Sequence, residues 1–476
     1  MLVLENWQGG YSEYNVIFYR NFAEFENEFA ISKNYYYLCN SKMKYDMIQE
    51  VKIRNFMSFK DDVVFSFEAT RDKTFEEYQV VNVAKGVRLL RFAMVYGANA
   101  SGKTNLLRVF DFLSQFWFTS TKNQDASTRV IPFRLDQNTP SETSRFEVKF
   151  YVGETKYWYI LELDSRKVYE EKLFIYRSSQ PTQLFSRELK DGQSVISFNS
   201  AVVKISKAAQ EEISLKCLTN MSLFAARNQV NVLMPEIDAA KDWMRLHIMP
   251  GINPQTYMFD YAGGRMLENQ EMKSYLLDFI HKADFNITGV RTDIVKKAFS
   301  SQQLEMIMER TDISAVEKEN LKQNPLFESL ETTFEHTVQN ERGTEKYTLP
   351  NNLQSDGTTR TFGIEAAIYQ ALKTQSMIHI DEIEASLHPE LVEFILQKFL
   401  AEKNNKSQLL ITTHYDPLLN TVNDLLRSDS VWFTEKDEAG STKLYSLVEF
   451  KGQKRISSHQ KAYRNGQFGA LPNIKG

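Results

Sequence analysis

The sequence predicts an α/β protein with a core of parallel strands, and three observations support this class. A mostly apolar run at 89–96 has the length of a strand and leads into a glycine-rich loop at 97–104. Apolar residues at helical spacing follow at 105–113. Two further apolar runs, 377–380 and 408–413, each lead into polar residues. This pattern is typical of α/β folds that bind ligands at the carboxyl ends of parallel strands.

The glycine-rich loop is a complete G-x-x-x-x-G-K-[ST] phosphate-binding motif in the strand–loop–helix context that the motif requires. It comprises Gly97, Ala98, Asn99, Ala100, Ser101, Gly102, Lys103 and Thr104. The glycines let backbone N–H groups close around phosphates, and the following helix adds its positive N-terminus. In such loops the Lys reaches the β- and γ-phosphates and the Thr hydroxyl binds Mg²⁺. A chance match is expected in roughly 1% of chains of this length, so the loop predicts a site for ATP and Mg²⁺.

Asp381 and Glu382 directly follow the apolar run at 377–380. An Asp at the end of a strand beside a phosphate loop is a usual ligand of Mg²⁺ or of its bound water, and Glu382 is placed to polarise the attacking water. Taken alone, the pair is equally well explained as the solvated end of a buried strand. We expect His379, inside the run, to be a packed side chain, and Pro389 suits the first position of the next helix.

A helix start precedes this strand, at 353–360. Ser355 or Asp356 can cap the helix, and Gly357 permits close backbone approach to an anion. Apolar residues at helical spacing between 364 and 372 support the helix itself. Taken alone, this segment is an ordinary helix start.

The order of these motifs along the chain is similar to that of a known protein family. A phosphate loop, a Ser-x-Gly helix start, a strand ending in Asp-Glu, a Ser-Leu-His-Pro turn at 386–389 and a strand ending in His414 follow one another. With the opening at 47–60 and the ending at 468–472, the chain resembles the standalone ABC/SMC-like ATPases of bacteria. These are relatives of SMC and RecF heads and of the overcoming-lysogenization-defect nucleases. The resemblance is nearest to a subgroup of anti-phage defence operons that includes PtuA and AriA.

The resemblance implies an ABC/SMC-type P-loop ATPase head with an antiparallel β-layer and a helical insertion. It also implies a homodimer or higher homo-oligomer, in which each subunit completes the nucleotide site of the other. His414 is then the switch histidine that senses the γ-phosphate. The ABC signature is represented by Ser355, Asp356, Gly357 and Thr358. Asp356 stands where the second Gly of that signature belongs, so this loop departs from the family pattern.

Motif positions divide the chain into four parts. We expect an N-terminal extension at 1–46, a first ATPase lobe at 47–189, a helical insertion at 190–345 and a second lobe at 346–476. The extension is rich in aromatic residues. It is either a docking element for a partner or the result of a start codon assigned too early.

Composition excludes several classes of protein. The net charge of −4 and pI of 6.1 lack the basic footprint of a dedicated nucleic-acid binder, although a local basic groove is compatible with them. No apolar run has the length of a membrane span. The two cysteines, Cys39 and Cys217, lack metal-ligand spacing and suit the reducing cytoplasm.

These observations favour one function over two alternatives. Only about sixty residues follow His414, too few for an added nuclease domain with its own core. We therefore expect a Mg-dependent, ATP-hydrolysing switch subunit of a bacterial anti-phage system that gates a separately encoded effector protein. The insertion and the extension are the expected effector contacts. The alternatives are a RecF/SMC-like DNA-repair or chromosome-associated ATPase that binds DNA directly, and a scaffold that uses ATP only to dimerise.

Overall fold

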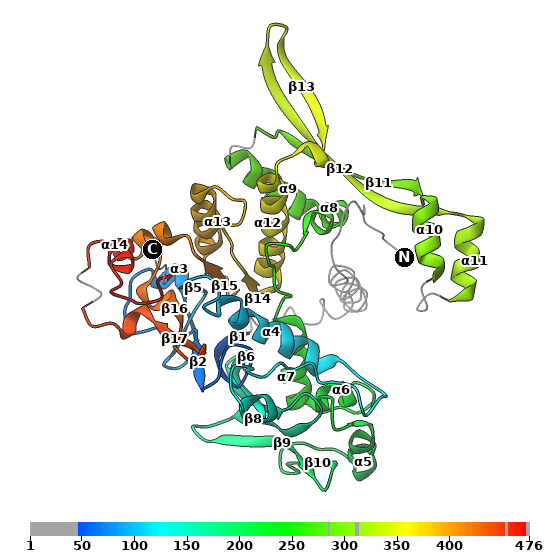
Figure 1. Cartoon of the computed structure of the whole chain (residues 1–476), viewed down its shortest axis with the longest axis vertical. Helices are drawn as coiled ribbons and strands as arrows, with labels where there is room; N and C mark the ends of the chain where they lie inside the picture. The colour runs from blue at the N-terminus through cyan, green and yellow to red at the C-terminus, as the bar shows by residue number, and fades with distance from the viewer. Residues whose placement is uncertain (1–45, 284–285, 310–313, 453–455, 473–476) are drawn as a thin grey trace. The chain divides into compact units, whose positions relative to one another are not determined.

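A computed structural model describes residues 46–472, apart from 284–285, 310–313 and 453–455 (Figure 1). The expected extension at 1–46 therefore lies outside the described residues, except for Asp46. The chain forms two compact units. The P-loop unit comprises Lys42–Pro254 and Gln370–Gly476, and the described part of the insertion unit is Gln255–Tyr369.

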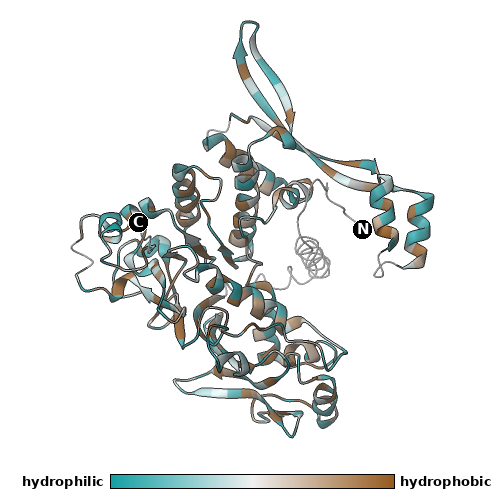
Figure 2. Cartoon of the chain, in the orientation of Figure 1, coloured by the Kyte–Doolittle hydropathy of each residue, from teal (hydrophilic) through white to brown (hydrophobic). Residues whose placement is uncertain are grey.

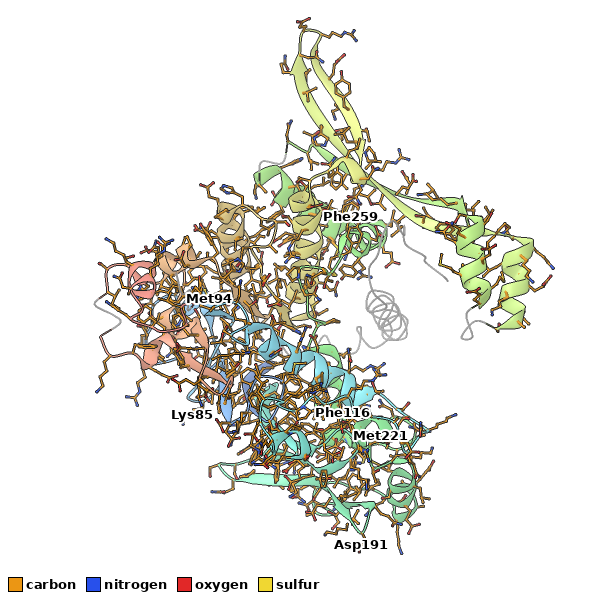
Figure 3. All side chains as sticks on the ribbon, in the orientation of Figure 1. Lys85, Met94, Phe116, Asp191, Met221 and Phe259 are labelled. Atoms are coloured by element: carbon orange, nitrogen blue, oxygen red, sulfur yellow. The ribbon has the colours of Figure 1, made fainter. Side chains whose placement is uncertain are left out.

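A five-stranded sheet lies at the centre of the P-loop unit, in the order β14-β15-β5-β16-β17. Its strands are β14 (Met377–Ile380), β15 (Gln408–Thr413), β5 (Phe92–Gly97), β16 (Val431–Lys436) and β17 (Thr442–Ser446). The first four are parallel, and only β17 runs antiparallel to its neighbour. Every residue of β14, β15 and β5 is buried, as expected for parallel strands covered on both faces. Met94, in the middle of β5, lies among closely packed side chains (Figure 3).

The expected single strand at 89–96 is wrong, because the apolar run contains two strands. β4 (Val87–Leu90) pairs with β3 (Val80–Ala84) in a separate two-stranded sheet, and β5 begins only at Phe92. Arg91 separates them. Its buried guanidinium donates to backbone carbonyls, among them that of Glu402 at 2.8 Å.

A seven-stranded antiparallel sheet forms the second layer of the P-loop unit, in the order β10-β9-β8-β7-β6-β1-β2. Its strands are β1 (Met47–Arg54), β2 (Val63–Ser66), β6 (Ser144–Val152), β7 (Thr155–Leu163), β8 (Val168–Tyr176), β9 (Pro181–Lys190) and β10 (Gln193–Phe198). Along β6 and β8, buried residues largely alternate with partly exposed ones, so one face of the sheet packs on the core. The expected antiparallel β-layer is therefore confirmed, and with it the α/β class.

Helix α4 (Lys103–Phe118) contacts both sheets and so connects the phosphate loop to the two layers. The ring of Phe112 lies 5.2 Å from that of Phe146 on β6. Nearby, the ring of Phe110 lies 5.7 Å from that of His379 on β14. The helix is therefore held from both sides by the core.

Three helices that follow β10 belong to the P-loop unit: α5 (Lys207–Lys216), α6 (Leu223–Arg227) and α7 (Pro235–Leu246). The ring of Trp243 stacks on Phe150 of β6 at 4.0 Å, and Phe224 lies 5.8 Å from Tyr159 of β7. These aromatic contacts complete the core of the antiparallel layer. The compact insertion unit accordingly begins at Gln255 rather than at the expected 190.

The chain covers the outer side of β14 just before it enters the insertion unit. Ile248 and Ile252 form parallel bridges with Met377 and Ile380. The backbone N–H of Asp381 donates to the carbonyl of Ile252 at 2.7 Å. This segment therefore pairs with β14 along its whole length.

The insertion unit combines helices with a three-stranded antiparallel sheet of order β11-β12-β13 (Figure 1). The strands are β11 (Gly289–Ala298), β12 (Leu326–Asn340) and β13 (Gly343–Pro350). The helices are α8 (Phe259–Glu268), α9 (Gln270–Lys282), α10 (Ser301–Glu309), α11 (Ala315–Gln323) and most of α12 (Asp356–Thr374). Rings of Phe259, Phe334 and Phe362 meet at 5.4 to 5.7 Å in its core. Figure 3 labels Phe259. The expectation of a helical insertion thus missed the strands, although Thr332 and Phe334 are buried at alternate positions of β12.

The remaining helices of the P-loop unit are α3 (Glu76–Gln79), α13 (Pro389–Ala401) and α14 (His459–Arg464). α13 begins with Pro389, as expected, and His388 caps it by accepting from the N–H of Glu390. Within the described ranges, no helix has the length and apolar character that a membrane span requires.

Candidate nucleotide-binding site

The phosphate loop connects β5 to α4, and both of its glycines are sterically required. Gly102 precedes the helix with a φ of 112°, in the left-handed region that glycine tolerates. A Cβ atom there would lie 2.3 Å from Oγ1 of Thr442. A Cβ atom on Gly97 would lie 2.4 Å from Oγ1 of Thr434. The loop is therefore packed against the hairpin of β16 and β17.

Three buried hydroxyl groups, which we name the hydroxyl clamp (Ser58, Thr434 and Thr442), hold this loop. Oγ1 of Thr434 lies 2.7 Å from Oγ of Ser101. Oγ1 of Thr442 lies 2.8 Å from both the carbonyl of Ser101 and Oγ of Ser58. Asn105, on α4, donates to the same Ser58 hydroxyl at 2.8 Å. Sequence reasoning missed the clamp, because isolated Ser and Thr residues carry no distinctive pattern.

Lys103 is buried at the first position of α4, with 5% of its surface exposed. Its Nζ donates to the carbonyls of Gly97 at 2.8 Å and Ala98 at 3.2 Å. Burial lowers the pKa of Lys103, while the nearby carboxylates of Glu382 and Asp381 act in the opposite direction. The side chain is thus held within the loop that the motif assigns to phosphates.

Asp381 joins the phosphate loop to the end of β14, and its side chain is buried. Oγ1 of Thr104 donates to its Oδ2 at 2.8 Å, and Oγ1 of Thr412 donates to its Oδ1 at 2.5 Å. A hydroxyl and a carboxylate side by side at a phosphate loop are the hard oxygen ligands that Mg²⁺ prefers. These two residues, Thr104 and Asp381, therefore fit a Mg²⁺ ion shared with nucleotide phosphates.

Glu382 follows directly and is held by the neighbouring strand β15. Its backbone N–H donates to Oγ1 of Thr412 at 2.8 Å. Its φ of 45° is left-handed, a conformation that costs a non-glycine residue free energy and is found preferentially at functional sites. Thr412 thus fixes both members of the acid pair.

His414 lies directly after β15, with 55% of its side chain exposed. Its backbone N–H donates to Oε1 of Glu384 at 2.7 Å, and its Nδ1 lies 3.0 Å from the same oxygen. Sequence reasoning gave Glu384 no role. The available signal was a third acid two positions after Glu382, on the turn that follows β14.

His379 is packed inside the protein, as expected, with its Nε2 3.0 Å from Oδ1 of Asp111 on α4. The same carboxylate accepts from the backbone N–H of Gly251 at 3.0 Å. The side chain of Asp111 is 38% exposed, and its partial loss of water raises its pKa, but the contacts with His379 and Gly251 outweigh this, so the pKa lies below its usual value. This contact joins α4 to β14 at a second point, away from Thr104.

The Ser355–Thr358 segment starts α12 in the insertion unit. The N–H of Thr358 donates to Oγ of Ser355 at 3.1 Å, so Ser355 caps the helix. The side chains of Ser355 and Asp356 are exposed. The remaining predicted site residues, 97–104, 381–382 and 414, belong to the P-loop unit.

A phosphate loop that follows one parallel strand, an Asp that follows another and an α/β core are the parts of a P-loop ATPase. The family model that matches this chain is described as "AAA domain, putative AbiEii toxin, Type IV TA system" and matches residues 92–203 and 262–420. These residues are more than half of the chain, and the chain belongs to this family.

Among solved structures, the chain is similar to SMC heads. The SMC head domain from Thermotoga maritima is 12% identical, with a TM-score of 0.37, over 85% of this chain and 99% of that one. A Pyrococcus furiosus Smc head domain, with an extended coiled coil and bound to the C-terminal domain of ScpA, is 11% identical. Its TM-score is 0.38, over 89% of this chain and 99% of that one. No curated protein matches the chain.

Proposed function

We propose that this chain is a Mg-dependent, ATP-hydrolysing switch that works in a bacterial anti-phage system by gating a separately encoded effector. The proposal of ATPase activity rests mainly on the 2.8 Å hydrogen bond between the side chains of Thr104 and Asp381. It brings the end of the phosphate loop and the end of β14 to the same place, where a Mg²⁺ ion would bind the nucleotide phosphates.

The proposed roles follow from chemistry that depends on positioned charge. Lys103 and Thr104 bind phosphate and Mg²⁺, and Asp381 binds Mg²⁺ or one of its water molecules. Glu382 orients the attacking water, and His414 contacts the γ-phosphate. No covalent intermediate is required, because water attacks the γ-phosphate in line with the leaving group.

Two substitutions separate binding from hydrolysis. Glu382→Gln keeps the shape of the side chain but removes the base, so ATP binding should persist while turnover falls by about 100-fold or more. Lys103→Ala should weaken ATP binding itself. Nucleotide titration and phosphate release, each with and without Mg²⁺, measure the two effects. Full activity of Glu382→Gln would contradict the assignment, and a wild type that binds ATP without hydrolysing it would support the scaffold alternative.

The Ser355–Thr358 segment is proposed to complete the nucleotide site of a second subunit. Its exposed Ser355 and Asp356 at a helix N-terminus are available to an anion. In this arrangement, Lys103→Ala and Ser355→Arg each inactivate the homodimer. Each mixed dimer of the two variants contains one intact composite site. It should therefore recover up to about half of the activity of the wild-type dimer. Light scattering with ATP and Glu382→Gln protein should show the dimer, and a strict monomer would count against this proposal.

The description of the family supports a role in a two-component system, because it names a toxin of a type IV TA system. The insertion unit offers exposed apolar side chains around α10 and α11, where Figure 2 shows hydrophobic residues among hydrophilic ones. They include Ile294 on β11, 55% exposed, Met306, 50% exposed, and Val316, 70% exposed. We propose these side chains as effector contacts.

A switch must differ in its affinity for the effector between nucleotide states. Bacteria that express this chain alone should gain little protection against phage, and adding the adjacent gene should restore protection. Val316→Ser should reduce protection without changing ATP turnover, whereas Leu215→Ser, which removes an exposed apolar side chain from α5, is the matched control. Full protection by the chain alone would contradict a separate effector. Salt-dependent DNA binding that stimulates turnover would instead favour a DNA-binding ATPase.

A further inference from the structure

The carboxylate of Glu384 is nine-tenths buried, yet its hydrogen bond among the described residues comes from the partly exposed His414. Its side chain is 10% exposed, and Oε1 accepts from the backbone N–H of His414 at 2.7 Å. Nδ1 of the same histidine lies 3.0 Å from Oε1. One oxygen atom therefore holds both the backbone and the ring of His414.

The turn after β14 is built so that this carboxylate reaches the end of β15. Glu382 and Ser386 both have left-handed φ values, 45° and 60°. The N–H of Ala385 donates to the backbone carbonyl of Glu382 at 2.9 Å, and the N–H of Leu387 donates to the backbone carbonyl of Glu384 at 2.9 Å. Two left-handed residues within five positions cost free energy because this turn contains no glycine. The contacts around the turn must therefore stabilise it. This geometry brings Glu384 to His414.

The second carboxylate oxygen has no structural use that would explain its burial. Oε2 of Glu384 is buried and has no hydrogen-bond partner among the described residues. A buried carboxylate oxygen without a partner destabilises a fold. A carboxylate kept there at such a cost is more readily explained by function than by stability.

Glu384 also adds negative charge to the phosphate site. Together with Glu382 and Asp381, it acts electrostatically on Lys103. Because phosphates are anionic, a third carboxylate near Lys103 opposes nucleotide binding. Nucleotide binding therefore does not explain the contact between Glu384 and His414.

We propose that Glu384 is the positioning residue for His414. Its Oε1 lies 3.0 Å from Nδ1, so a proton on Nδ1 faces the carboxylate, which orients the ring and leaves Nε2 as the nitrogen available to the γ-phosphate or to the attacking water. Carboxylates orient histidines in this way at many metal sites. This inference rests on the proposed ATPase function, and it assigns Glu384 an effect on turnover that passes through His414.

A double-mutant cycle tests the proposal directly. The proteins are the wild type, Glu384→Ala, His414→Ala and the double variant, with Glu384→Gln as the conservative substitution. Glu390→Ala, an exposed acid at the start of α13, is the control. ATP affinity and single-turnover hydrolysis are measured for each, and thermal unfolding shows whether each variant is folded.

Glu384→Ala should lower the hydrolysis rate by about 10-fold to 100-fold, the usual range for loss of a partner that orients a histidine. ATP affinity should stay unchanged or rise, because a negative charge has been removed. Glu384→Gln retains an acceptor oxygen and should lose less. The double variant should match His414→Ala, since the two residues act as one unit.

Three results would overturn the inference: wild-type hydrolysis in Glu384→Ala, rate losses that multiply in the double variant, or a parallel loss of ATP affinity in folded Glu384→Gln. Failure of the proposed function looks different. In that case the wild type itself does not hydrolyse ATP, or Glu382→Gln remains active.

Discussion

The two sides of the nucleotide site are held by different kinds of contact. On the phosphate-loop side, residues 97–104 are enclosed by the buried hydroxyl clamp, and both glycines touch threonine side chains. At the end of β15, His414 is 55% exposed and, among the described residues, is held by one carboxylate, that of Glu384. The first side has many fixed contacts and the second has few.

This difference suggests how binding and hydrolysis are separated. A loop held by buried hydrogen bonds is organised before nucleotide arrives, which lowers the entropy lost on binding. A partly exposed histidine that is held by one side chain can change position between nucleotide states with a small change in free energy. We therefore expect substitutions on the phosphate-loop side to alter affinity and substitutions around His414 to alter turnover.

The strongest test of the fixed side is Gly102→Ala. The new Cβ would lie 2.3 Å from Oγ1 and 2.8 Å from Cγ2 of Thr442, and the φ of 112° disfavours any side chain. We expect loss of measurable ATP binding and destabilisation of about 3 kcal/mol or more. Calorimetric titration and thermal unfolding provide the measurements. Gly86→Ala is the matched control, since Gly86 also has a left-handed φ but has nothing within 4 Å of its Cβ position. Normal ATP binding by folded Gly102→Ala protein would show that the loop is not held as described.

A smaller effect is expected from Thr442→Val, which keeps the shape of the side chain and removes its hydroxyl. The buried carbonyl of Ser101 and the hydroxyl of Ser58 each lose a contact at 2.8 Å. Loss of about 1–2 kcal/mol should weaken ATP binding by about 10-fold and leave the rate of bound-ATP hydrolysis nearly unchanged. Thr442→Ser should recover most of the affinity. A turnover defect with normal affinity would reverse the comparison between the two sides.

The smallest effect concerns the contact between Asp111 and His379, which joins α4 to β14. The pKa of Asp111 is lower in the folded protein than its ordinary value of 3.8. Its contribution to stability is therefore complete above about pH 4 and disappears as the pH falls through the lower, folded-state pKa. Asp111→Asn should cost about 1 kcal/mol at pH 7, because the side chain is 38% exposed, and the difference should shrink below pH 4. Urea unfolding at pH 7 and pH 3.5 measures it, and an equal difference at both values would mean that the charge contributes nothing.

How much of the site the sequence predicts depends on whether its residues are contiguous. The phosphate loop and Asp381-Glu382 are short local patterns, and the structure brings both to one place through Thr104. The hydroxyl clamp is different, because Ser58 and Thr442 lie in distant segments that only the folded sheets bring together. No local pattern marks them.

The same reasoning explains the differences in the fold. Apolar content alone does not show where one strand ends and the next begins. The sequence pattern therefore does not reveal that Arg91 separates β4 from β5. The strand β12 has polar residues at both exposed and buried positions, such as Glu331 and Thr332, and its alternation is too weak to override the helical pattern that precedes it. The helices α6 and α7 join the antiparallel layer through aromatic contacts that sequence spacing does not reveal.

The segment that pairs with β14 has one more consequence. Met377–Ile380 is fully apolar apart from His379, and it would otherwise be the open edge of the five-stranded sheet. An apolar edge strand with free N–H and C=O groups recruits strands from other molecules and promotes aggregation. Bridges from Ile248 and Ile252 occupy that edge, so the strand that carries the acid pair is shielded from intermolecular β-pairing.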